Sequence, residues 1–176
     1  IRQASHMLCD GMHPLFDVSP ELLLLDVGDL PLPNTSLNGM RAAMPQLVDA
    51  LIRKHHMAWL GGDHSITLPL LRCYRRWLGR PLAVIHFDAH CDTWSDHFGG
   101  PSGHGTRVYE AMQEGLVINQ CFMQLGIRSA GIREAREYVR EQGGLIFDAR
   151  GLRGMESAEQ LAPVLQTMRE RLAQHG

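Results

Sequence analysis

Residues 82–94 read Leu-Ala-Val-Ile-His-Phe-Asp-Ala-His-Cys-Asp-Thr-Trp, and this stretch decides the fold. Its first six residues form an apolar run with β-branched side chains, which is typical of a strand buried on both faces of a parallel sheet. Asp88, His90 and Asp92 follow at alternating positions. If the backbone stays extended there, the three side chains point to one side. They would then suit a divalent cation. The alternative is an acidic loop in which His90 is merely solvated.

On both sides of this stretch, apolar runs typical of strands alternate with runs that have the period of helices. We expect further strands at residues 21–29, 57–60, 121–127 and 145–147, and helices at residues 37–55, 67–78, 106–114, 131–142 and 157–174. This alternation predicts an α/β fold with three αβα layers and a mostly parallel sheet joined by right-handed crossovers. We expect one domain over residues 1–176.

Composition narrows the class of protein. A chain of 176 residues that is 44% hydrophobic can bury the core of one ordinary domain. The net charge of −2 includes no basic surplus, so we expect neither a nucleic acid nor an anionic membrane as partner. No apolar run approaches the length of a membrane span. The four cysteines are scattered without a C-x-x-C pair, which favours a reducing compartment, and we expect a cytoplasmic protein.

Histidines occur at two other places where ligands are expected. His64 lies in Gly-Gly-Asp-His-Ser, between the predicted strand at residues 57–60 and the helix that follows. In an open α/β sheet this position is at the rim where ligands bind. His97 and His104 lie in a glycine-rich loop, residues 95–105, of the kind that covers a site. By itself, Gly-Gly-Asp-His is equally compatible with a turn and a histidine in a hydrogen-bond network.

The two predicted strand ends would bring these residues together. If the strand that ends at Gly61 lies beside the strand that ends at Asp88, His64 reaches the same rim as Asp88, His90 and Asp92. Four potential metal ligands would then converge from two loops. Asp26 and Asp29 close the predicted strand at residues 21–29, and there we expect structural roles.

Short motifs occur along the chain in a definite order. They are Asp-Val-Gly-Asp at residues 26–29, Gly-Gly-Asp-His-Ser at 61–65, Phe-Asp-Ala-His-Cys-Asp at 87–92, His-Gly-Thr at 104–106 and Gln-Leu-Gly-Ile-Arg at 124–128. With this spacing the chain resembles the ureohydrolase (arginase) superfamily, and its agmatinase members most closely. The resemblance extends over nearly the whole chain.

The resemblance implies a binuclear manganese hydrolase that releases urea from a guanidino compound, with agmatine converted to putrescine and urea as the first expectation. His64 and Asp92 would bind one Mn²⁺ ion. His90 would bind the other, and Asp88 would bridge the two. His104 matches the loop histidine that moves protons, so Asp92 and His104 are the residues assigned to catalysis. Two metals that share a water would lower its pKa and so supply hydroxide at neutral pH.

Other residues near the motifs have less definite roles. Trp94 and His97 are candidates for the lining of the substrate entrance, although both are equally compatible with ordinary loop positions. Cys91 should point away from the ligands and pack as a small hydrophobe. His86, inside the strand, is expected to be a hydrogen-bonded core histidine.

The sequence does not decide between several guanidino substrates or between two oligomeric states. Guanidinobutyrate or another ω-guanidino compound would meet the same metal chemistry as agmatine. Arginine fits less well, because Trp94 stands where the resembling arginases carry an asparagine for the α-amino acid. Resemblance also implies a homo-oligomer, either a trimer or a hexamer.

The chain departs from the family pattern at both ends. The resemblance implies a strand before Ile1 and, after Gly176, an Asp-x-Asp motif that supplies two more carboxylates. One explanation is that these residues belong to a longer enzyme, in which Asp-x-Asp follows Gly176 within about a strand length, roughly ten residues. The alternative is a non-catalytic protein that binds metal or pairs with a partner.

Overall fold

The computed structural model describes residues 2–7, 11–33, 35–96 and 98–176. The chain divides into two compact units, residues 1–31 and 32–176. The first unit contains the short helix α1 (Arg2–Ser5) and a 3₁₀ turn, η1 (Pro20–Leu22). In the described residues, no helix combines the length and apolar character that a membrane span requires.

The strand predicted over residues 21–29 is wrong. η1 covers its beginning, and residues 24–30 have no regular secondary structure. A strand needs a hydrogen-bonding neighbour, and the described part of this unit offers no other strand. Asp26 is instead held by Arg2, whose Nε and Nη2 donate at 2.7 and 2.8 Å, and by the backbone N–H of Gly28. These contacts give Asp26 a structural role, as expected.

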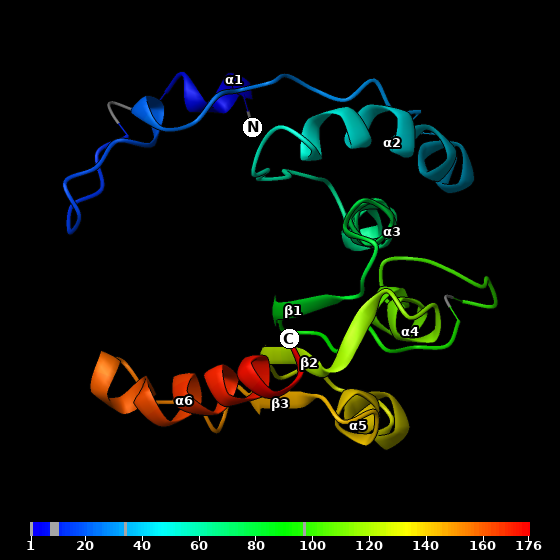
Figure 1. Cartoon of the computed structure of the whole chain (residues 1–176). Coiled ribbons are helices and arrows are strands. Elements are labelled where there is room, and N and C mark those ends of the chain that lie inside the picture. Colours follow the sequence, from blue (N-terminus) through cyan, green and yellow to red (C-terminus); the bar gives the residue numbers. More distant parts are fainter. Residues whose placement is uncertain (1, 8–10, 34, 97) are drawn as a thin grey trace. The chain divides into compact units, whose positions relative to one another are not determined.

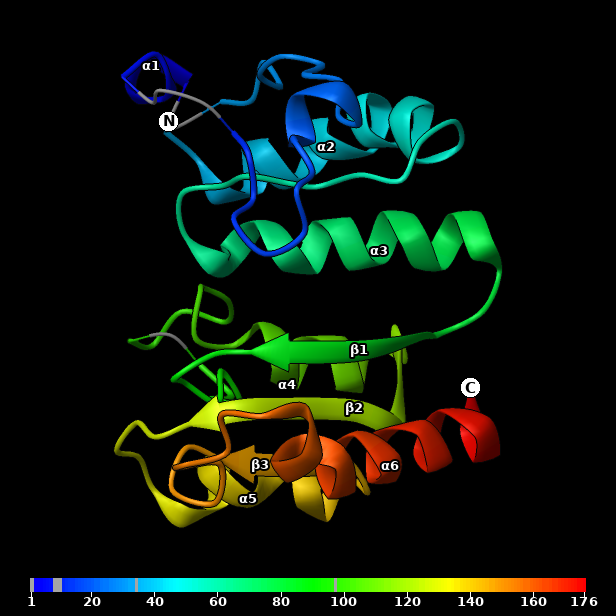
Figure 2. The same ribbon diagram turned by 90° about the vertical axis from the view of Figure 1, so that its left-hand side faces the viewer.

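The second unit holds the sheet and the remaining helices. Its elements are α2 (Leu37–Ile52), η2 (His64–Ile66), α3 (Thr67–Leu78), β1 (Leu82–Phe87), α4 (Arg107–Gln113), β2 (Val117–Ile127), α5 (Arg133–Glu141), β3 (Leu145–Asp148) and α6 (Ala158–His175). The three strands are parallel in the order β1-β2-β3. Figure 2 shows them pointing the same way, with the beginning of α3 at the side of their carboxyl ends. The predicted α/β class with a parallel sheet is confirmed.

The sheet lies between two helical layers. Phe122 of β2 packs with Leu68 of α3, Val108 of α4 and Val139 of α5. Met123, the next residue, faces the other side and packs with residues of α6. Because successive side chains of a strand point to opposite faces, one strand contributes to both cores. Figure 1 shows α4 and α5 on one side of the strands and α6 on the other.

The strand predicted at residues 57–60 is also wrong. These residues have no regular secondary structure, and Leu60 is exposed. Among the described strands, β1 pairs only with β2. No described strand therefore pairs with this run of four residues. Its Trp59 Nε1 instead donates to the hydroxyl of Tyr74 in α3 at 3.3 Å. The predicted pairing of two strands that end at Gly61 and Asp88 does not occur.

Candidate metal centre

The loop that follows β1 is anchored to the carboxyl end of β2. The backbone N–H of Asp88 donates to the carbonyl of Leu125 at 3.1 Å, which continues the ladder one residue beyond the strand. The carbonyl of Ala89 then accepts from the backbone N–H of Arg128 at 2.9 Å and from that of Ser129. Hydrogen bonds to and just beyond the neighbouring strand restrict the conformation of this loop. The backbone that carries the Asp88 carboxylate is therefore held in place by these hydrogen bonds.

Asp92 is positioned by a reversal of the backbone. Its φ is +53°, in the left-handed region that Asp tolerates better than most residues. Its carbonyl accepts the backbone N–H of Val108, in the first turn of α4, at 3.0 Å. The expectation of an extended backbone through Asp92 is therefore wrong. The turn brings Asp92 back toward Asp88, so alternation along a strand is not what makes them converge.

His64 reaches these carboxylates from the beginning of η2. The Asp63 side chain accepts the backbone N–H of Ser65 at 2.8 Å and so caps this turn, as expected for an N-cap aspartate. His64 Nδ1 lies 3.0 Å from Asp88 Oδ2 and 3.5 Å from Asp92 Oδ2. The predicted convergence of His64, Asp88 and Asp92 is present, although a helix start and not a paired strand brings His64 there.

His86 is a further member of this cluster. It is buried in β1, its Nδ1 faces Gln124 Nε2 at 3.1 Å, and its Nε2 lies 3.2 Å from Asp88 Oδ2. Gln124 Nε2 also donates to the carbonyl of Cys91 at 2.8 Å, so its amide nitrogen faces both groups. A neutral ring that accepts at Nδ1 carries its proton at Nε2 and donates it toward Asp88. His86 is thus the hydrogen-bonded core histidine that was expected, but its Nε2 also faces the site.

Burial and a neighbouring cation determine the protonation of His86. Burial lowers the pKa of this imidazole, the positive charge of Arg107 lowers it further, and together they hold it at about 4. The ring is therefore neutral at physiological pH. For Asp88, burial raises the pKa, but the hydrogen bonds from the His90 backbone and from His86 outweigh it and hold the pKa at about 2.

His90 lies on the other side of Asp88. Its backbone N–H donates to Asp88 Oδ1 at 2.9 Å, and its Nδ1 lies 3.3 Å from the same oxygen. The side chain is 68% exposed and is not in the group formed by His64, His86, Asp88 and Asp92. Asp88 therefore directs one carboxylate oxygen toward His64 and the other toward His90. Such a position suits a carboxylate shared between two sites.

Arg107, the first residue of α4, is the site residue that sequence patterns missed. Its Nη2 lies 2.5 Å from His64 Nδ1, 2.6 Å from His86 Nε2, 2.7 Å from Asp92 Oδ2 and 3.3 Å from Asp88 Oδ2. The side chain is 4% exposed. A signal was available, because a cation in the first turn of a helix opposes the helix dipole and needs acidic partners when buried.

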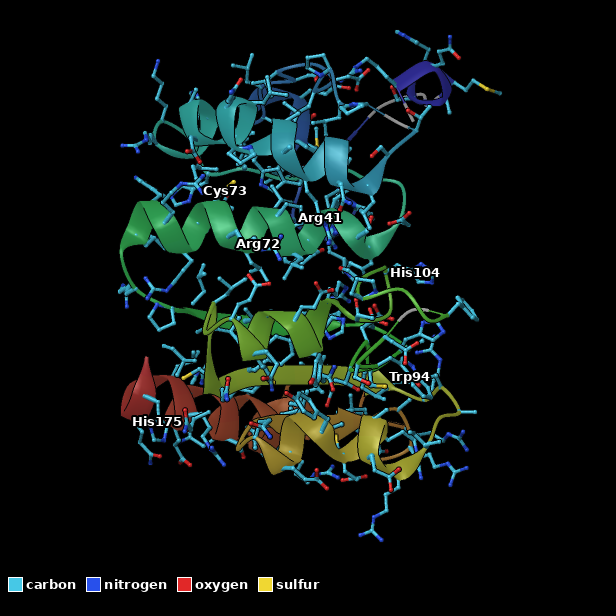
Figure 3. The ribbon with its side chains drawn as sticks, turned by 90° about the vertical axis from the view of Figure 1, so that its right-hand side faces the viewer. Arg41, Arg72, Cys73, Trp94, His104 and His175 are labelled. Carbon is cyan, nitrogen blue, oxygen red and sulfur yellow. The ribbon has the colours of Figure 1, made fainter. Side chains whose placement is uncertain are left out.

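Three loop residues, Trp94, His97 and His104, were predicted near the site. The backbone N–H of Trp94 donates to the carbonyl of Gly105 at 3.2 Å, which ties the loop after β1 to the His-Gly-Thr segment. Trp94 and His104 lie at the same end of the unit, opposite His175 (Figure 3). The pKa of Asp63 is lowered mainly by hydrogen bonds from Ser65, and the charge of His104 adds to this, so His104 is near η2. His97 lies outside the described residues.

The chemistry of the cluster suits a divalent cation. One ligand atom from each of His64, His86, Asp88 and Asp92 lies within 4.8 Å of the others. Mixed imidazole and carboxylate donors fit borderline to hard divalent ions. The two carboxylates also carry negative charge that such an ion would offset. His64, Asp88 and Asp92 are the residues best placed to hold it, since the His86 proton is at Nε2.

Comparison with known proteins identifies the family and the relatives of this chain. A family model described as the arginase family matches residues 1–175. An agmatinase from Salmonella paratyphi B is 34% identical over 153 residues, which cover 85% of this chain and 47% of that protein. An agmatinase from Neisseria meningitidis serogroup C is 41% identical over 115 residues, 65% of this chain and 36% of that protein. The chain thus spans about half or less of these relatives.

Solved structures show the same fold. Proclavaminate amidino hydrolase from Streptomyces clavuligerus aligns over 96% of this chain and 56% of its own, with a TM-score of 0.75 and 28% identity. A hypothetical agmatinase from Burkholderia thailandensis covers 75% of this chain and 40% of its own, with a TM-score of 0.61 and 32% identity. The family match covers residues 1–175, nearly the whole chain. The chain belongs to the arginase family.

Proposed function

We propose that this chain carries part of the active site of a metal-dependent hydrolase that cleaves a C–N bond of a guanidino compound and releases urea. The observation that carries the proposal is the convergence of His64, Asp88 and Asp92 at the carboxyl end of β1. His64 Nδ1 lies 3.0 Å from Asp88 Oδ2 and 3.5 Å from Asp92 Oδ2. Membership of the arginase family and the named agmatinase relatives support the reaction class.

A bound metal would supply Lewis-acid activation of water, which the attack on a resonance-stabilised guanidinium carbon requires. Asp88 and Asp92 would supply negative charge to the ion, and His64 a ring nitrogen. Asp88 faces His90 with its second oxygen, which supports a second position for a metal beside the first. His104, in the loop near η2, is suited to deliver a proton to the leaving amine. Trp94 would border the entrance.

Manganese is the proposed metal and agmatine the proposed substrate. Both agmatinase relatives match the segment that contains the cluster, which supports agmatine over arginine. Guanidinobutyrate remains the second candidate, because the reacting group is the same. We extend the proposal to a cytoplasmic homo-oligomer.

The test is urea release by the Mn²⁺-loaded protein with agmatine, guanidinobutyrate and arginine as substrates. We expect the highest kcat/KM with agmatine. Asp92→Asn should lower kcat/KM by more than about 100-fold, because outer-shell partners of a metal already account for 10- to 100-fold effects. Glu134→Gln, at an exposed position of α5, is the matched control and should keep full activity.

Two results would contradict the proposal. Absence of urea from all three substrates in Mn²⁺-loaded protein would show that the part of the active site in this chain does not catalyse the reaction by itself. Full activity of Asp92→Asn would remove that carboxylate from the site. Mn²⁺ binding, measured separately by calorimetry, distinguishes a protein that binds metal without catalysis from one that does not bind it.

A further inference from the structure

One nitrogen of Arg107 lies at the centre of the proposed metal ligands. Its Nη2 lies within 2.5 to 3.3 Å of His64, His86, Asp88 and Asp92. These are the same four residues whose ligand atoms gather within 4.8 Å. The guanidinium therefore occupies the volume that a metal ion would need.

The contacts of this guanidinium are unlike those of an arginine used as a hydrogen-bonding fork. Nη2 has two hydrogens but four neighbouring nitrogen and oxygen atoms. One of these, His86 Nε2, is itself a donor when Gln124 donates to Nδ1 and then cannot accept from Arg107. Nε, by contrast, is buried and has no hydrogen-bond partner in the described residues. A buried structural arginine normally distributes its bonds over several of its five donors. The Arg107 guanidinium therefore acts on this cluster mainly through its positive charge.

The charges explain why a cation stays there. Asp88 and Asp92 together carry two negative charges, and Arg107 offsets one of them. Burial is the largest influence on the Arg107 pKa and lowers it, whereas Asp92 and Asp88 raise it, so the carboxylates act to keep the guanidinium charged. A divalent ion would offset both charges and could use lone pairs from several ligands at once, which a nitrogen with two hydrogens cannot do.

We propose that Arg107 is an internal cation that fills the His64, Asp88 and Asp92 cluster in the metal-free protein and has to leave it before a divalent ion can be held there. The inference rests on the proposed function, which assigns these three residues to the metal. It implies that Arg107 stabilises the metal-free fold and competes with the metal. Metal affinity is then set by the balance between a tethered guanidinium and a free ion.

The test is Mn²⁺ titration by calorimetry of the protein freed of metal with a chelator. We expect Arg107→Met to bind Mn²⁺ about tenfold more tightly than wild type if the guanidinium occupies the cluster about nine-tenths of the time. In the absence of metal, this variant should melt at a lower temperature than wild type, because two carboxylates lose their cation. Added Mn²⁺ should raise its melting temperature by more than it raises that of wild type.

Arg107→Lys keeps the charge on a shorter side chain and serves if Arg107→Met does not fold. It should also bind Mn²⁺ more tightly than wild type, but by a smaller factor. Arg72→Gln is the matched control: Arg72 pairs with Glu114 at 2.5 and 2.8 Å away from the cluster, so its loss should leave Mn²⁺ affinity unchanged.

The outcomes separate this inference from the proposed function. Mn²⁺ affinity of the folded Arg107 variants equal to or below that of wild type would overturn the inference and leave the proposed function intact. Absence of Mn²⁺ binding in wild type and in every Arg107 variant would contradict the metal site itself, and both proposals with it.

Discussion

His86 is held neutral by its surroundings, and this has a consequence for stability. In the folded state its pKa is about 4, below the ordinary value of 6.5. Between these two values the unfolded chain binds a proton that the folded chain does not. The free energy of unfolding therefore decreases as the pH falls from about 6.5 to about 4. Outside this pH range the contribution of His86 does not change with pH.

We expect this decrease to be of the order of 3 kcal/mol in metal-free protein, since each pKa unit corresponds to about 1.36 kcal/mol. His86→Gln should flatten the dependence between pH 6.5 and 4. The measurement is chemical denaturation at a series of pH values in the presence of a chelator. His55→Gln, at an exposed turn position, is the control and should retain the wild-type dependence. An unchanged dependence in His86→Gln would show that another group is responsible.

At the scale of single residues, the sequence predicted His64, Asp88 and Asp92 as neighbours, and the structure brings them together. It did not predict Arg107, because a helix period does not say which first-turn side chain turns inward. His86 was recognised only as a core residue. Whether its second nitrogen faces a ligand cluster depends on Gln124, which lies on another strand.

Helix α6 shows how a local sequence signal defines an element. Ser157 Oγ accepts the backbone N–H of Gln160 at 3.2 Å, and Gln160 Oε1 accepts the backbone N–H of Ser157 at 2.9 Å. This reciprocal pair is a capping box, which satisfies backbone donors that a helix start leaves unpaired. The predicted beginning of this helix at residue 157 agrees with it.

Ser157→Ala should lower the free energy of unfolding by about 1 kcal/mol, the usual cost of losing an N-cap. Ser157→Thr keeps a hydroxyl acceptor and should cost less than the alanine variant. Urea denaturation monitored by circular dichroism measures both. Equal stability of Ser157→Ala and wild type would mean that the cap does not limit the stability of this helix.

Helices were predicted better than strands at the scale of elements. The amphipathic pattern of α2, with Met40, Met44, Val48 and Ile52 buried, is present in the sequence itself. The apolar runs at residues 21–29 and 57–60 have strand composition, but a strand exists only with a partner. No described strand pairs with either run, so composition alone overestimated the sheet.

At the scale of the whole second unit, the sheet separates two cores. Val139 of α5 belongs to the core on one face, together with Phe122, and Val164 of α6 belongs to the core on the other face, together with Met123. The intervening backbone is the shared boundary between them. Changes in one core should therefore have little effect on packing in the other.

We expect Val139→Ala and Val164→Ala each to lower the free energy of unfolding by about 1 to 3 kcal/mol, from lost burial and a small cavity. The double variant should equal the sum within about 0.5 kcal/mol, as for sites without shared partners. A double-mutant cycle by urea denaturation measures this. A larger coupling energy would show that the two cores rearrange together.

The sequence by itself determined the α/β class, the helices and the residue types at the rim of the sheet, because periodicity and short motifs are properties of neighbouring residues. Only the tertiary structure decided which side chains meet. His64 comes from a helix start, Asp92 from a left-handed turn and Arg107 from the next helix. Their convergence depends on hydrogen bonds between segments distant in the chain, such as that from the Val108 N–H to the Asp92 carbonyl, and no local pattern encodes such contacts.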